Sequence, residues 1–223
     1  MKKLLSGIVD FRKRIRPSVK DTFAKLALGQ KPDCLLINCS DSRVAVNLFA
    51  STDPGDLFVV RNVGNMVTPC DVHGTSSGDV SEIAALEFAV KELKVGSIIV
   101  CGHSECGAMN ALISGRSQLQ NPHLKEWLKN ADEALQPGRF VIHAQKPFTP
   151  QSQVSQRNVL LQIEHLKTYP FIAEQVAAGT LKIYGWWFDI AEAEVYYWDE
   201  GAKSFMVIDE IRAERMINRL SQK

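Results

Sequence analysis

Short runs of consecutive apolar residues alternate along the chain with longer segments whose apolar residues recur at helical spacing. The apolar runs cover residues 34–38, 57–60, 97–101 and 181–187. Unbroken apolarity is typical of strands buried on both faces, as in a parallel sheet with helical crossovers. Between these runs, residues 83–93 and about 152–178 carry the spacing of amphipathic helices. The order βαβαβ predicts an α/β fold.

The C-terminal pattern is different. Residues 193–198 alternate between polar and apolar, Asp199-Glu200-Gly201 provides turn chemistry, and a second short run follows at 204–207. This pattern predicts an antiparallel edge, and a last helix is expected from Glu210. The predicted architecture is a mostly parallel central sheet of four strands plus this edge, flanked by helices.

The first 30 residues read as two short helices broken near Pro17. Such a helical arm buries little by itself, so we expect it to pack on a neighbouring subunit. Residues 31–223 are expected to form one α/β domain, in which the polar, proline-containing stretch 136–153 is a long surface loop.

Composition excludes several functions. Lys+Arg number 26 against Asp+Glu 25, a formal charge of +1, which gives no electrostatic argument for nucleic-acid binding. No stretch approaches the roughly 20 apolar residues of a membrane span, and no signal peptide is visible, so a cytoplasmic location is expected. Five cysteines, an odd number in a chain of this size, favour a reducing compartment with some thiols on metal over a disulfide framework.

Three potential metal ligands follow two of the predicted strands. Cys39 directly follows the first strand, His103 follows the third across Gly102, and Cys106 lies three residues further on. Because the carboxyl ends of parallel strands lie at one edge of the sheet, we expect the three side chains to meet there. Two thiolates and one imidazole suit Zn²⁺ and leave a fourth position for water or substrate, which is a catalytic arrangement.

Asp41 and Arg43 stand beside the first ligand. We expect Asp41, at a predicted helix N-terminus, to accept a hydrogen bond from a zinc-bound hydroxide, and Arg43 to clamp that carboxylate in a planar fork. In the alternative interpretation, Asp41 only caps a helix and Arg43 is a surface cation.

The remaining cysteines and histidines allow one serious rival. Cys101, on the same side of its strand as His103, could close a four-ligand structural site, although this would leave Asp41 and Arg43 unexplained. Cys34 is expected in the core, and Cys70 in a loop as a solvated thiol. The other histidines are expected at the surface or in loops: His73, His123, His143 and His165.

The Cys-x-Asp-x-Arg element at 39–43 and the His-x-x-Cys element at 103–106 resemble the β-class carbonic anhydrases, and the resemblance extends from about Leu26 through Trp198. It implies a Zn²⁺ enzyme that interconverts CO₂ and bicarbonate by attack of zinc-bound hydroxide. It also implies a homodimer or larger even-numbered assembly with active sites near the subunit interface, and no nucleic-acid or membrane partner.

The resemblance also implies a substrate pocket of the plant-like type. Its members here are Gln30, Phe58, Val63, Phe88 and Gly107, with Phe88 at a place where that type often has tyrosine. A second type of the family has an inhibitory bicarbonate site built from tryptophan, arginine and tyrosine. This chain has Leu36, Arg61 and Phe188 at those places, so we expect that site to be absent and water, not Asp41, to be the fourth zinc ligand.

Two other functions remain compatible with the sequence. One is a carbon disulfide hydrolase, since relatives with that activity use the same zinc ligands. The other is a non-enzymatic, zinc-stabilised interaction module with four protein ligands.

Overall fold

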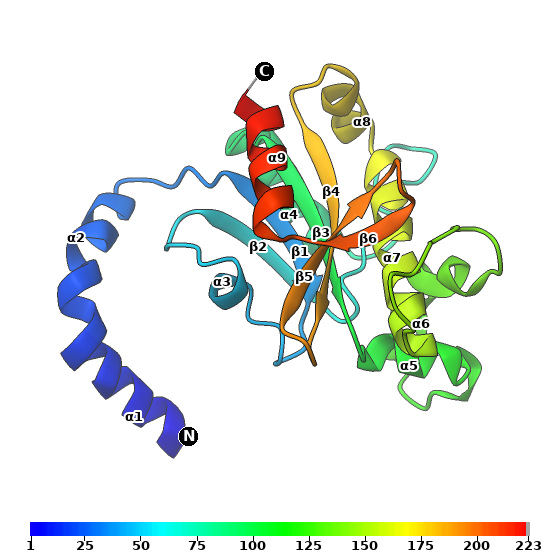
Figure 1. Cartoon of the computed structure of the whole chain (residues 1–223), viewed down its shortest axis with the longest axis horizontal. Helices are drawn as coiled ribbons and strands as arrows, with labels where there is room; N and C mark the ends of the chain where they lie inside the picture. Colours follow the sequence, from blue (N-terminus) through cyan, green and yellow to red (C-terminus); the bar gives the residue numbers. More distant parts are fainter. Residues whose placement is uncertain (222–223) are drawn as a thin grey trace.

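A six-stranded sheet forms the centre of the molecule (Figure 1). The computed structural model describes residues 1–221. The strands are β1 (Cys34–Cys39), β2 (Leu57–Asn62), β3 (Ser97–His103), β4 (Lys182–Asp189), β5 (Glu194–Asp199) and β6 (Ser204–Val207). They lie in the order β2-β1-β3-β4-β5-β6; the first four are parallel, whereas β5 and β6 are antiparallel. The predicted α/β fold with four parallel strands and an antiparallel edge is therefore confirmed.

The helices connect and flank these strands. They are α1 (Lys2–Asp10), α2 (Arg16–Leu26), α3 (Val46–Phe49), α4 (Val80–Glu87), α5 (Gly107–Ile113), α6 (Pro122–Trp127), α7 (Pro150–Lys167), α8 (Pro170–Ala177) and α9 (Glu210–Ser221). The single helix predicted over 152–178 is two helices, because Pro170 cannot donate a helical hydrogen bond and starts a new helix. Short helical segments between 107 and 135 were not predicted.

The N-terminal helices α1 and α2 extend away from the sheet and have no buried residue (Figure 1). The break between them was predicted near Pro17 and is instead a π-helical turn at Phe11–Ile15. Pro17 lies in the first turn of α2, where a missing backbone N–H costs nothing. Among residues 1–221, no helix combines the length and apolarity needed to cross a bilayer.

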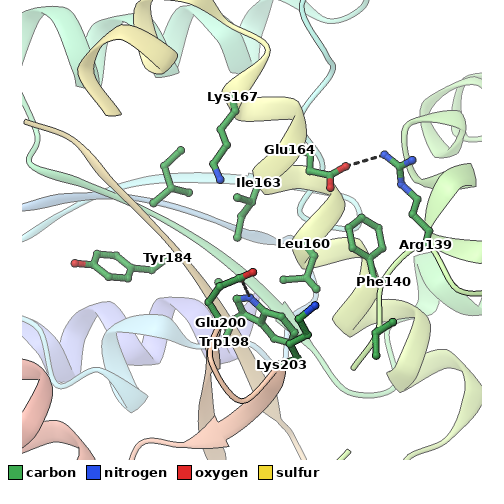
Figure 2. Close-up of a pocket in the computed structure, with 13 residues that line it drawn as sticks. Arg139, Phe140, Leu160, Ile163, Glu164, Lys167, Tyr184, Trp198, Glu200 and Lys203 are labelled. Carbon is green, nitrogen blue, oxygen red and sulfur yellow. Dashed lines mark hydrogen bonds and ion pairs between the residues drawn. The ribbon is translucent and has the colours of Figure 1, made fainter. Parts of the chain in front are cut away.

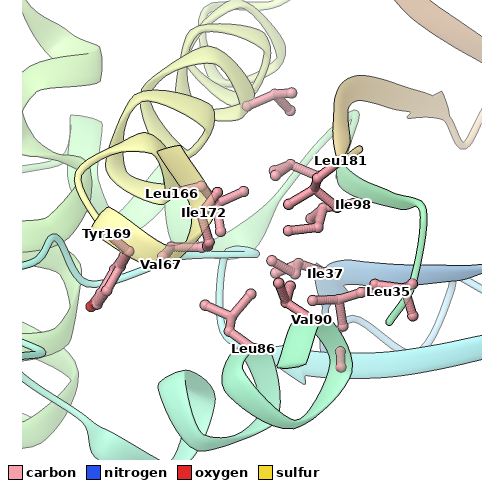
Figure 3. Packing of buried hydrophobic residues seen from close by; sticks show 14 of the residues in the cluster. Leu35, Ile37, Val67, Leu86, Val90, Ile98, Leu166, Tyr169, Ile172 and Leu181 are labelled. Carbon is pink, nitrogen blue, oxygen red and sulfur yellow. The ribbon is translucent and has the colours of Figure 1, made fainter. Parts of the chain in front are cut away.

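Both faces of the two central strands, β1 and β3, are covered, which explains their unbroken apolar sequences, whereas the edge strand β2 leaves Val59 41% exposed. Leu35 and Ile37 of β1 face a large cluster shared with α4, α7 and α8, part of which is shown in Figure 3. Leu36, between them, packs on the opposite face with Val44 and Val46. All six β1 residues are buried. The period-two alternation of a strand thus supplies two cores at once.

The register of the parallel strands brings the predicted ligands to one edge. Asn38 pairs with Cys101, so Cys39 and His103 lie at the carboxyl ends of neighbouring strands. There is no room for a side chain at Gly102, the residue before His103 in β3, because an added Cβ would lie 2.7 Å from the side chain of Val159 in α7. Helix α7 therefore presses directly against the end of β3.

Candidate metal centre

The three predicted ligand residues meet at the carboxyl edge of the sheet. The Sγ atoms of Cys39 and Cys106 and a ring nitrogen of His103 all lie within 4.8 Å of one another. Cys39 ends β1, His103 ends β3, and Cys106 is the N-cap residue of α5. The turn between His103 and Cys106 needs a left-handed residue, Glu105 at φ 52°. This local turn aims two ligands three residues apart at one point.

The imidazole of His103 is oriented for metal binding. Its side chain is fully buried, and Nδ1 donates a 2.8 Å hydrogen bond to the carbonyl oxygen of Ser104. Because a carbonyl only accepts, Nδ1 carries the proton and Nε2 carries the free lone pair. Nε2 is buried without a hydrogen-bond partner. A buried nitrogen aimed at two sulfurs fits Zn²⁺, which accepts thiolate and imidazole ligands.

Contact between the two ligand thiols favours ionisation of one of them, Cys39. The neighbouring Cys106 thiol lowers the pKa of Cys39 to about 4, and contacts with His103 and the backbone N–H of Gly64 act in the same direction. The pKa of Cys106 is raised by its contact with Cys39 and by burial. This environment favours the thiolate form of Cys39, which is the form that binds metal.

Asp41 and Arg43 form the predicted pair beside this cluster. Arg43 donates from Nε to Oδ1 at 2.9 Å and from Nη2 to Oδ2 at 2.7 Å. These bonds hold the pKa of the Asp41 carboxyl far below its usual range. Oδ2 lies 3.9 Å from His103 Nε2, so an ionised carboxylate faces the metal position. Asp41 does not sit at the expected helix N-terminus: α3 begins at Val46, and Asp41 instead closes its own turn by accepting from the Arg43 backbone N–H.

Two arginines fix the backbone around the cluster. Arg43 Nη2 also donates to the carbonyl oxygen of Glu105, which ties the Asp41 turn to the turn between the two later ligands. Arg61 donates to the carbonyl oxygens of Cys39 and Asp41 at 2.8–3.2 Å. Arg61, which stands at the place of the arginine in the inhibitory bicarbonate site of the second type, thus binds backbone carbonyl oxygens here. Leu36 is buried, and Phe188 stacks on Phe49 with ring centroids 4.7 Å apart.

The predicted pocket residues fall into two groups. Val63, 43% exposed, directly precedes Gly64, and Gly107 begins α5 beside Cys106. Phe58 pairs in register with Leu35, which lies four residues before Cys39 in β1. Four residues correspond to about 13 Å along a strand, so Phe58 is far from the ligand. Its ring lies 5.9 Å from that of Phe88, which is 43% exposed.

Gln30 is likewise exposed and precedes β1. Within a single copy of the chain, two of the five pocket candidates, Val63 and Gly107, therefore lie beside the metal ligands. The other three, Gln30, Phe58 and Phe88, lie toward the amino ends of the strands.

Cys101 does not join the ligand cluster, which within residues 1–221 consists of Cys39, His103 and Cys106. It is fully buried with Leu36 and Val44, its thiol donates to the carbonyl of Gly102, and burial raises its pKa to about 12. It is a core thiol in this structure.

A separate cavity of about 410 Å³ lies over the amino-terminal half of β4 (Figure 2). Ile183 and Tyr184 form part of its lining, together with the ion pair between Arg139 and Glu164. Ile183 pairs with Ile98, five residues before His103. This cavity therefore belongs to a different part of the molecule from the metal cluster.

Several residues that hold the cluster in place carry no sequence signal of their own. The backbone N–H of Gly64 lies 3.4 Å from Cys39 Sγ, and the Ser155 hydroxyl donates to the carbonyl of His103 at 2.7 Å. His165, expected at the surface, is partly buried in α7 and contacts the carbonyl of Val67. Only the fold shows that Gly64 and Ser155 meet the ligand segments and that His165 packs against the loop after β2.

Taken together, a parallel α/β sheet with three buried potential metal ligands and a carboxylate beside them at its carboxyl edge is an arrangement typical of metalloenzymes. Comparisons with known proteins identify its family. The family model described as carbonic anhydrase matches residues 34–195. A carbonic anhydrase of Synechococcus elongatus is 38% identical over 87% of this chain and 70% of its own, and one of Pseudomonas aeruginosa is 36% identical over 94% and 93%.

The solved structure of the β-carbonic anhydrase CcaA superimposes with a TM-score of 0.83 at 35% identity, covering 93% of this chain and 98% of that one. The chain belongs to the β class of the carbonic anhydrase family. It is accordingly a lyase that catalyses the reversible hydration of CO₂ to bicarbonate.

Proposed function

We propose that one Zn²⁺ per subunit binds to Cys39, His103 and Cys106, and that Asp41 and Arg43 complete the active site for CO₂ hydration. The observation that carries this proposal is the ionised Asp41 carboxylate held 3.9 Å from the free Nε2 of His103. Zinc would supply Lewis acidity, which generates a strong nucleophile from water at neutral pH. With three protein ligands, the fourth position is left for water or substrate.

Asp41 orients the reacting water in this scheme. An ionised carboxylate only accepts hydrogen bonds, so Oδ2 would accept one from the O–H of a water beside the ligands and direct the lone pair of that water outward. Arg43 occupies both carboxylate oxygens in a planar fork, which keeps Asp41 charged and prevents it from rotating. The same guanidinium excludes Asp41 from the ligand set.

The substrate pocket is proposed to form between two subunits. Val63 and Gly107 lie at the ligands of one chain, and the remaining candidates, Gln30, Phe58 and Phe88, would enter from a second copy. The half-exposed Phe88 ring beside Phe58 is apolar surface of the kind that pairs across an interface. An apolar slot suits CO₂, which carries no charge and no hydrogen-bond donor.

The exposed N-terminal arm supports our proposal of a homodimer or larger even-numbered assembly. Leu4, Leu5, Ile8 and Phe11 are 40–66% exposed on helices that bury no residue of their own. A helix with an apolar face needs a surface to cover it. The Sordaria macrospora β-carbonic anhydrases, similar at 30% identity with a TM-score of 0.70 over 88% of this chain and 95% of theirs, are tetrameric. We propose residues 1–30 as the dimer arm of a single catalytic domain spanning 31–223.

A cytoplasmic location is proposed from thiol chemistry. All five cysteines are free, and two of them must stay reduced to bind metal. Reducing compartments preserve such thiols.

A stopped-flow CO₂ hydration assay on zinc-loaded protein tests this function. Wild type should turn over CO₂. Asp41→Asn should lose most of that activity while retaining zinc. The amide carries no charge and has only one oxygen to accept hydrogen bonds from Arg43. Asp53→Asn is the matched control, since it removes an exposed carboxylate from the loop before β2, at the opposite end of the sheet from the cluster.

Other outcomes of the assay would select a rival. Inactivity with CO₂ but turnover of carbon disulfide would select the hydrolase, and inactivity with both would favour the zinc-stabilised interaction module.

A further inference from the structure

A stripe of polar residues runs along the buried face of α7, next to the metal cluster. Its members are Ser152, Ser155, Asn158 and Gln162, all at most 2% exposed. Spacings of three, three and four residues place them on one side of a helix. Buried polar groups cost stability unless they are hydrogen-bonded, so their partners show what the stripe is for.

The first two members hold the turn that carries two ligands. Ser155 Oγ donates to the carbonyl oxygen of His103 at 2.7 Å and accepts from the indole of Trp187. Ser152 Oγ accepts from the backbone N–H of Glu105 at 3.3 Å. Both contacts fall between His103 and Cys106, so α7 sets the position of this turn.

The other two members hold the loop that follows β2. Asn158 Nδ2 donates to the carbonyl oxygen of Gly64 at 2.9 Å. Gln162 Oε1 accepts from the backbone N–H of Val67 at 2.7 Å. This loop meets the remaining ligand, Cys39, because the Gly64 backbone nitrogen lies 3.4 Å from Cys39 Sγ. Asn158 thus anchors the very residue that donates to the sulfur.

The orientation of both amides is dictated by fixed partners. Val67 N–H can only donate, so Gln162 presents its oxygen there and its nitrogen to the carbonyl of Asn130 and to Asn158 Oδ1. Asn158 must therefore accept at Oδ1, which turns Nδ2 toward Gly64. His165 Nδ1 also donates to Gln162 Oε1 and the Val67 carbonyl. The network has one consistent direction from the helix to the loop.

We propose that Asn158, oriented by Gln162, is a positioning residue of the metal centre that aims the Gly64 N–H at Cys39 Sγ. The proposal rests on the proposed function and deepens it. A hydrogen bond to a ligating sulfur withdraws charge from it and so tunes the metal it binds, as outer contacts of metal ligands generally do. Gly64 adopts φ +82°, and an added Cβ would come within 2.8 Å of the Met66 side chain, so a residue with a side chain would not fit at this point of the loop.

The test compares cobalt-substituted and zinc-loaded Asn158→Leu with wild type. Leucine is close to asparagine in size and removes the donor to Gly64. Gln156→Leu is the matched control: Gln156 is also a buried amide of α7, 2% exposed, and its Nε2 has no hydrogen-bond partner. The readouts are the thiolate-to-cobalt charge-transfer band and zinc affinity measured by chelator competition, with thermal unfolding to establish folding.

Asn158→Leu is expected to move the charge-transfer band to longer wavelength and to weaken zinc binding about 10- to 100-fold, the range found for outer contacts of metal ligands. Gln156→Leu should leave the band and zinc affinity unchanged. An unshifted band and unchanged affinity in folded Asn158→Leu would overturn the proposal, as would an equal shift in the control.

If Asn158→Leu does not fold, Gln162→Leu carries the test. It removes the amide donor that orients Asn158, so a smaller shift in the same direction is expected; no shift would overturn the proposal. Both readouts are taken without CO₂. An inactive wild type with a normal thiolate band would therefore count against the proposed function and leave this inference standing.

Discussion

Glu82 is a buried carboxyl group that should make the stability of this protein depend on pH. It lies in the first turn of α4 with 6% exposure. Its carboxylate accepts hydrogen bonds from the backbone and hydroxyl of Thr68, and more weakly from Asn62 Nδ2 at 3.4 Å. Burial outweighs these bonds and raises the pKa of Glu82 from 4.5 to about 7.

The direction of the effect follows from where the proton is held more tightly. Because the pKa of Glu82 is raised on folding, the folded protein binds this proton more strongly than the unfolded chain between pH 4.5 and 7. The free energy of unfolding therefore falls as pH rises through this window and is level above it. At 1.36 kcal/mol per pKa unit, the raised pKa of Glu82 corresponds to about 3 kcal/mol.

Glu82→Gln removes this titration while keeping the size of the side chain. The free energy of unfolding is measured by urea denaturation at pH 5, 6, 7 and 8, at one fixed free zinc concentration, for the variant and wild type. Comparing the two at each pH cancels every other titrating group. The variant should gain up to about 3 kcal/mol relative to wild type between pH 5 and 8.

Glu87→Gln is the matched control, because it removes one negative charge from the exposed side of the same helix, where Glu87 pairs with Lys91. A difference between Glu82→Gln and wild type that stays constant or shrinks as pH rises would refute the reasoning. It would mean that Thr68 and Asn62 stabilise the carboxylate more than burial penalises it.

Three further predictions concern the metal centre. Arg43→Lys keeps the charge but loses the fork, so kcat should fall about 10- to 100-fold with zinc content unchanged; normal kcat in stopped-flow assays would contradict the clamp. Cys101→Ala should retain full zinc stoichiometry by metal analysis, since Cys101 lies in the core; loss of one equivalent would revive the four-ligand site. High bicarbonate should produce no cooperative inhibition at any pH, because Leu36 and Phe188 fill that region; cooperative inhibition in steady-state kinetics would show that such a site exists.

The sequence predicted those features that depend on local pattern and on general rules of parallel sheets. Unbroken apolar runs located β1, β2, β3 and β4, and turn residues located the antiparallel edge. The rule that the carboxyl ends of parallel strands share one edge was then sufficient to bring Cys39 and His103 together.

Features that depend on non-local contacts could not be predicted in this way. The α7 stripe has the composition of a solvated face, and only packing against the ligand segments explains Asn158 and Gln162. The separation of Phe58 from Cys39 depends on strand register, which local pattern does not determine. The prediction of a helix start at Asp41 is wrong. Aspartate accepts a hydrogen bond from a nearby backbone N–H both at helix caps and in isolated turns, and the sequence does not distinguish the two.

The central claim is that the polypeptide supplies three zinc ligands and holds Asp41 away from the fourth position. A crystal structure of the zinc-loaded wild type at neutral pH tests it most directly. The account predicts two sulfur ligands at about 2.3 Å, one imidazole nitrogen at about 2.0–2.1 Å and a water, with Asp41 in the fork of Arg43. A zinc ion whose fourth ligand is the sulfur of Cys101 or a carboxylate oxygen of Asp41 would contradict it.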